Sequence, residues 1–183
     1  MRSPTANTIA LLYCISFFGN SGIVAMAEPS ADEYKVKGAF LLNFAKFIDW
    51  PAAAFRATTD PISICILGKS PFGPEFDRAA KSLDIGGHKI AVQDDVAFSA
   101  LSGCQIVFVS SAERKRIRPL FEHLKGMNVL TVGEIDGFLS SGGVINFGLD
   151  SGKIRIEINA RAAEHANLRI SAKLLSLGQS RRK

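Results

Sequence analysis

The chain has 183 residues, of which 47% are hydrophobic, and a formal net charge of +5. One domain of ordinary size with its own core accounts for this length, so we expect no second domain. The positive charge is dispersed and interleaved with Asp and Glu, unlike the concentrated basic stripe of nucleic-acid-binding proteins. We therefore expect no nucleic-acid partner.

The N-terminal segment, residues 1–27, has the pattern of a secretory signal peptide. Arg2 precedes an uncharged apolar run over residues 8–18, and small residues then lead to Ala25-Met26-Ala27. This A-x-A pattern predicts cleavage after Ala27. A membrane anchor is the alternative, but the apolar run is shorter than the ~20 residues of a spanning helix. The sequence thus predicts a mature chain, residues 28–183, that is released into the periplasm.

The sequence places two cysteines in this mature chain. Cys65 lies inside the β-like run 62–67, and Cys104 lies just before a second such run, 106–109. If the two strands are neighbours, a disulfide can join them in a compartment that permits such bonds. The alternative is a pair of buried free thiols, because free cysteine packs well as a small hydrophobic residue.

The mature chain is predicted to open with a long apolar helix. Ser30 and Glu33 form a capping-box pattern at its start, and Asp49-Trp50-Pro51 ends it. Apolar residues occupy nearly all sides of this helix, so one side is expected in the core and the other in a dimer or partner interface. Burial on both sides is the alternative. The candidate partner-binding residues are Phe40, Leu41, Leu42, Phe44, Phe47 and Trp50.

The middle of the chain alternates short apolar runs with amphipathic stretches. This pattern predicts parallel strands joined by crossover helices. The expected strands span residues 62–67, 89–92, 105–109 and 129–132, and the expected helices span 72–83 and 114–124, with a helical turn at 96–101.

The C-terminal part is predicted to add an antiparallel hairpin. Asp150-Ser151-Gly152 joins strands 144–149 and 153–158, and a helical region follows from residue 160, broken near Asn167. The predicted fold is thus a single compact α/β domain with a mostly parallel sheet, crossover helices and an antiparallel C-terminal hairpin. In the second hairpin strand, Arg155 and Glu157 share the face opposite three isoleucines. They are candidates for a polar ligand or partner face; a solvated outer face with charge pairing is the alternative.

Catalytic motifs are not assembled in the sequence. Gly68-Lys69-Ser70 lacks the upstream glycine of a phosphate-binding loop, and Asp94 and Asp95 are neighbours in a loop. The three histidines lie far apart, without the spacing of a zinc site. We therefore expect no catalytic residues, no metal and no cofactor, and predict that the protein is not an enzyme.

Four segments resemble the YfiR-like family of periplasmic proteins: residues 34–51, 67–73, 155–159 and 168–175. The run Phe-Ala-Lys-Phe-x-x-Trp-Pro within the first is the most specific. The resemblance implies a compact, often dimeric α/β domain that inhibits a membrane-bound diguanylate cyclase through its periplasmic sensor domain. It also implies release of this inhibition by an OmpA-type outer-membrane lipoprotein. Cys65 and Cys104 match one family disulfide, which is redox-responsive in the family, but a second C-terminal pair is missing here.

Two functions follow as hypotheses. The preferred one is a non-catalytic periplasmic regulator that binds a membrane diguanylate cyclase and lowers cyclic di-GMP. The alternative is a periplasmic small-molecule receptor that uses the strand ends near Gly68 and the face of Arg155 and Glu157, because open α/β sheets bind ligands beyond their strand ends.

Overall fold

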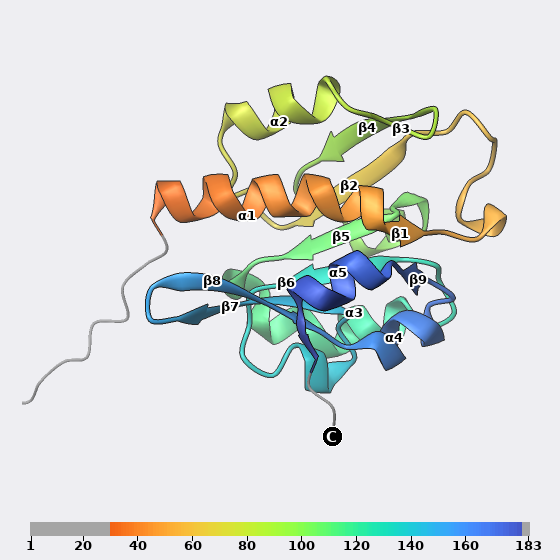
Figure 1. The fold of residues 1–183 in the computed structure, drawn as a ribbon. Coiled ribbons are helices and arrows are strands. Elements are labelled where there is room, and N and C mark those ends of the chain that lie inside the picture. The colour runs from red at the N-terminus through yellow and green to blue at the C-terminus, as the bar shows by residue number, and fades with distance from the viewer. Residues whose placement is uncertain (1–29, 181–183) are drawn as a thin grey trace, which may run out of the picture.

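The computed structural model describes residues 30–180, so the predicted signal peptide and its cleavage site lie outside the described residues. The main sheet has eight strands in the order β10-β8-β7-β6-β5-β2-β4-β3 (Figure 1). The strands are β1 (Ile48–Asp49), β2 (Ile62–Leu67), β3 (Asp84–Ile85), β4 (His88–Gln93), β5 (Ile106–Val109), β6 (Leu130–Gly133), β7 (Ile145–Asp150), β8 (Lys153–Ile158), β9 (Arg169–Ile170) and β10 (Gln179–Ser180). The helices are α1 (Ala31–Phe44), α2 (Pro74–Lys81), α3 (Ile117–His123), α4 (Ala160–His165) and α5 (Ala172–Leu177).

The pairing of the strands confirms the predicted fold class. β4, β2, β5, β6 and β7 are mutually parallel neighbours, whereas β7 and β8 form an antiparallel hairpin. Its turn places Ser151 at φ 51° and Gly152 at φ 76°, the left-handed backbone that a two-residue hairpin turn requires. The antiparallel pairing of β3 with β4 is an addition, since no strand was expected before residue 89 in this part of the chain.

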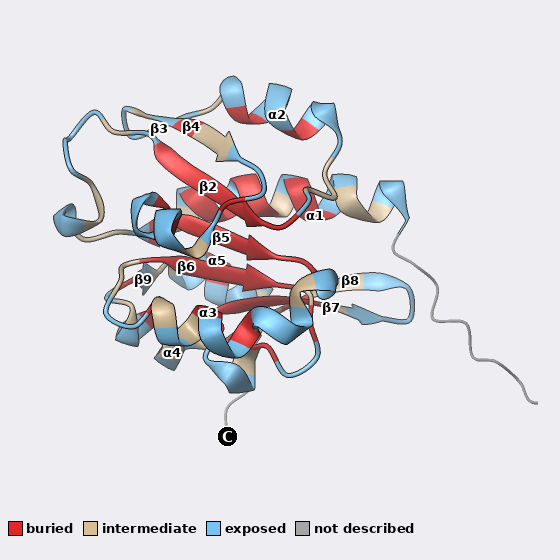
Figure 2. Cartoon of the chain, turned by 180° about the vertical axis from the view of Figure 1, so that it is seen from behind, coloured by how far each residue is buried: buried red, intermediate tan, exposed pale blue. Residues whose placement is uncertain are grey.

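The sheet separates two apolar cores because successive residues of a strand point to opposite faces. Ile62, Ile64 and Ile66 of β2 pack into the core on the side of α1, α2, α4 and α5. Cys65 and Leu67 of the same strand pack on the side of α3. The central strands are accordingly buried along their whole length (Figure 2).

The opening helix is shorter than predicted. α1 ends at Phe44, a 3-10 turn follows over Ala45–Phe47, and Ile48 and Asp49 then pair with Ile170 and Arg169 in a separate two-stranded sheet. The break predicted near Asn167 is present: α4 ends at His165, Asn167 has a left-handed backbone with φ 54°, and β9 begins at Arg169. Strand pairing between distant segments therefore ends the helix before the signal provided by Pro51.

The predicted helix over 114–124 is also shortened. Residues Ser111–Arg116 form a 3-10 helix, and α3 begins only at Ile117. Pro119 explains this start, because proline lacks an amide hydrogen and is tolerated only in the first turn of an α-helix. Among residues 30–180, no helix combines the length and apolar character needed to cross a membrane.

Candidate functional site

The predicted disulfide between Cys65 and Cys104 is present. Cys65 lies on β2 and Cys104 precedes β5, its parallel neighbour, which places the two Cα atoms 5.9 Å apart. Both residues are buried in the core on the α3 side, against Leu101, Leu120 and Phe138. The bond thus crosslinks the centre of the sheet and does not lie at an accessible surface.

The predicted partner-binding residues of the opening segment divide into two groups. Leu41, Leu42 and Phe44 are at most 5% exposed and belong to the core. Phe40, Phe47 and Trp50 pack against the core but are only partly buried. A partner can therefore contact only this second group without rearrangement of the domain.

The structure gives the partly buried aromatic residues distinct surroundings. Phe40 lies 6.4 Å from Phe147 of the hairpin, and the ammonium of Lys173 lies over the ring of Phe47 at 5.4 Å. Trp50 packs edge to face on Phe55 at 6.5 Å. Its indole Nε1 is buried and has no acceptor among residues 30–180.

A buried charge network ties α1 to the end of β6. The ammonium of Lys37 pairs with Glu134 at 2.6 Å and with Glu33 at 2.5 Å. The hydroxyl of Tyr34 donates to Glu134 at 2.9 Å, and the amide of Ser111 donates to the same carboxylate at 3.1 Å. The sequence signals this network only through the spacing of Lys37, four residues after Glu33.

The capping box at the start of α1 is only half formed. Ser30 accepts a hydrogen bond from the amide of Glu33, as predicted. The carboxylate of Glu33 instead pairs with Lys37. A buried cation is a stronger partner for a carboxylate than an exposed backbone amide, which explains the difference.

Arg155 and Glu157 share one face of β8, as predicted. Arg155 lies 3.5 Å from Asp150, and the amide of Asn146 donates to Glu157 at 3.4 Å. A cavity of about 240 Å³ is lined by Arg155 and Glu157 together with Asp136, Ser140 and Asn146. Gly68, the other element of the predicted ligand site, follows β2, which is separated from β8 by three strands. The structure therefore does not bring Gly68 and Arg155 into one site.

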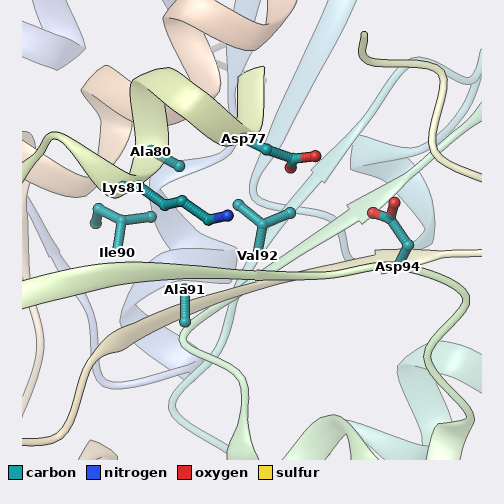
Figure 3. A pocket seen from close by; sticks show the side chains of 7 residues that line it. All are labelled: Asp77, Ala80, Lys81, Ile90, Ala91, Val92 and Asp94. Carbon is teal, nitrogen blue, oxygen red and sulfur yellow. The ribbon is translucent and has the colours of Figure 1, made fainter. Parts of the chain in front are cut away.

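A larger cavity of about 450 Å³ lies between α2 and β4 (Figure 3). Its floor is apolar, formed by Ala80, Ile90 and Val92, and its rim carries the charged residues Asp77, Lys81 and Asp94. Burial raises the pKa of Asp94, and the negative charge of Asp77 raises it further. In the sequence Asp94 stands out only as the neighbour of Asp95, because the approach of α2 depends on the tertiary fold.

The described residues hold no cluster of three His, Cys, Asp or Glu side chains able to bind a metal ion. Fold and surface features together define a disulfide-linked, mixed α/β domain with several clefts. The sequence model of the YfiR/HmsC-like family matches residues 34–179, and the chain belongs to this family.

No curated protein sequence matches the chain significantly. Among solved structures, a conserved domain protein from Vibrio cholerae O1 biovar El Tor matches with a TM-score of 0.46 and 12% identity. The match covers 65% of this chain and 54% of that chain.

Proposed function

We propose that the chain is a non-catalytic periplasmic regulator that binds the periplasmic sensor domain of a membrane-bound diguanylate cyclase and inhibits it. The supporting observation is family membership over residues 34–179, since members of the YfiR/HmsC-like family are periplasmic regulators of such cyclases. Inhibition lowers cyclic di-GMP in the cytoplasm. An OmpA-type outer-membrane lipoprotein that sequesters the regulator would restore cyclase activity.

The buried disulfide supports the proposed compartment. Disulfides form and persist in oxidising environments such as the bacterial periplasm and are rare in the cytosol. Cys65 and Cys104 are at most 3% exposed, so the bond fits a structural role in that compartment. This location agrees with the signal peptide predicted for residues 1–27.

The contact surface that we propose comprises Phe40, Phe47 and Trp50. Large aromatic side chains that are partly exposed are frequent energetic anchors of protein interfaces. The buried indole N–H of Trp50 adds a reason, because a partner could supply the acceptor that this donor lacks within residues 30–180. The same surface could serve a homodimer.

Affinity capture tests the proposal. Mature protein with a C-terminal tag is incubated with solubilised membranes, and captured proteins are identified by mass spectrometry. We expect enrichment of a membrane protein that carries a cytoplasmic diguanylate cyclase domain. The variant Phe47→Ser should lose this enrichment, whereas the matched control Val36→Ser, at a 46% exposed apolar residue of α1, should retain it. Capture of no cyclase under conditions of expression would contradict the proposal.

A second candidate function is that of a small-molecule receptor. The cavity of about 240 Å³ beside Arg155 and Glu157 supports it, since one cation, Arg155, and two anions, Asp136 and Glu157, line it with neutral polar groups. Metabolite extracts passed over immobilised mature protein would test this candidate. Retention of a compound by wild type and its loss in Glu157→Gln would favour the receptor.

A further inference from the structure

The cavity between α2 and β4 coincides with an open edge of the main sheet. β3 pairs with β4 only at His88 and Lys89, so no described strand lies beside the outer edge of residues 90–93. The cavity is lined by this same stretch of β4 on one side and by α2 on the other. Ile90 and Val92 point toward α2, whereas Ala91 points to the opposite face (Figure 3).

The hydrogen-bond pattern of β2 shows which backbone groups face the open edge. The carbonyl of Ser63 accepts from the amide of Gln105, so the Ser63 backbone faces β5. The backbone N–H and C=O groups of successive strand residues point to opposite edges of the strand. Those of Ile64 therefore point to β4, where its partner in register is Val92. In a parallel ladder Ile64 bonds to the neighbours of its partner, which leaves the N–H and C=O of Val92 directed outward.

We propose that this groove binds an extended segment of another protein, which adds to β4 as a strand and lies beneath α2. An unpaired strand edge is satisfied by another extended backbone, and the alternate side chains of that strand enter the adjacent pockets. The apolar floor of Ala80, Ile90 and Val92 suits apolar side chains at every second position.

The charges of the groove favour a basic segment. Asp77 and Asp94 have no ion-pair partner within residues 30–180, and the formal charge of the rim, with Lys81 included, is negative. The raised pKa of Asp94 reflects partial burial and the charge of Asp77, both of which a nearby cation would offset. The expected guest therefore places apolar residues toward the floor at every second position, and Lys or Arg at the flanking positions of that same face, which reach Asp77 and Asp94 (Figure 3).

A second copy of this chain fits the groove less well than a separate segment. β3 already occupies the outer edge at His88 and Lys89, so two β4 strands could pair over only a few residues. The inference goes beyond the proposed function, because it concerns the chemistry of the bound segment and not the identity of the protein that supplies it.

Peptide titration of isotope-labelled mature protein, followed by amide chemical shifts, tests this inference. The probe is a capped heptapeptide with Val at positions 3 and 5, Lys at positions 1 and 7 of the same face, and Thr at the remaining positions; its partner probe has Glu in place of Lys. We expect the Lys probe to shift the amides of residues 91–94 and to bind at least tenfold more tightly than the Glu probe. Val92→Pro should abolish binding, because it removes the outward N–H without breaking a bond to β2.

Charge variants keep the test independent of the folding of Val92→Pro. Asp94→Lys should weaken binding of the Lys probe at least fivefold, whereas Glu164→Lys, the same change at an exposed site on α4, should not. Absence of shifts at residues 91–94, or equal binding of the two probes, would overturn the inference. A concentration-dependent dimer that Val92→Pro abolishes would also overturn it, by assigning the edge to a second copy.

Discussion

Lys37 and Glu134 form an ion pair of 2.6 Å in which the side chains are only 3% and 2% exposed. Removing one member of a buried pair leaves the other charge without compensation. We therefore expect Lys37→Met to lower the free energy of unfolding by about 3 kcal/mol or more, measured by urea denaturation.

Two variants control this prediction. Lys35→Met, which breaks the exposed pair with Asp32 one turn away, should leave the free energy of unfolding close to that of wild type. Adding Glu134→Gln to Lys37→Met should recover part of the loss, because one uncompensated carboxylate is then neutral. Equal stabilities of the Lys37→Met and Lys35→Met proteins would show that the buried pair is not a determinant of stability.

The disulfide is expected to stabilise the domain through the unfolded chain. Closing a loop with a sequence separation of 39 residues is worth about 4 kcal/mol on the chain-entropy model. The double variant Cys65→Ala and Cys104→Ala should unfold at a lower temperature and still show the circular dichroism spectrum of the folded protein. Two alkylatable thiols in the denatured, unreduced wild type would contradict this account.

Leu42→Glu should unfold the domain. Leu42 is 5% exposed and belongs to the core, so the substitution buries an unpaired carboxylate at a cost of about 3 kcal/mol or more. Unfolding is the result expected if the opening helix is buried on both sides at this position. Asn43→Glu, at the adjacent exposed position, should leave the melting temperature near wild type. A folded Leu42→Glu protein would return Leu42 to the candidate interface.

The raised pKa of Asp94 predicts how the free energy of unfolding changes with pH. Its pKa is raised above 3.8, chiefly by burial, so the folded protein binds this proton more tightly than the unfolded chain. The free energy of unfolding therefore falls as the pH rises from 3.8 through the folded pKa. Asp94→Asn should be slightly more stable than wild type at pH 7, because the carboxylate is only partly buried and solvent screens it, and should show no gain well below pH 3.8.

The lowered pKa of Asp84 predicts the opposite dependence of stability on pH. Its hydrogen bond to Lys89, followed by one from the Gly87 amide, lowers its pKa below 3.8. Its stabilising effect is thus present above 3.8 and lost as the pH falls through the folded pKa. Asp84→Asn should lose stability at pH 7 where Asp94→Asn gains it, as judged by urea denaturation at pH 7 and pH 3. If both variants gained stability at pH 7, or both lost it, the directions assigned to the two pKa shifts would be wrong.

The parts of the fold that were predictable from sequence rest on local patterns. Apolar runs identified β2 and β5, and their adjacency confirmed the predicted bond between Cys65 and Cys104. The glycine turn after Asp150 fixed the hairpin of β7 and β8. Each of these signals lies within a few residues of the element it specifies.

The missed features depend on contacts between distant segments. Ile48 leaves the helix because Ile170 pairs with it, and Lys37 can be buried because Glu134 is nearby. The groove at Asp94 exists because α2 crosses above β4. Periodicity along the chain does not encode such pairings. The candidate interface illustrates the same limit, since Leu42 and Phe47 look alike in sequence and differ in burial.

The concentration of cyclic di-GMP in cells that lack this protein reports directly whether the protein inhibits a membrane diguanylate cyclase. Deletion should raise cyclic di-GMP and surface attachment, and return of the mature protein to the periplasm should reverse both. The rise should vanish when the captured cyclase is deleted as well. Unchanged cyclic di-GMP after deletion, under conditions in which the protein is expressed, would contradict the account.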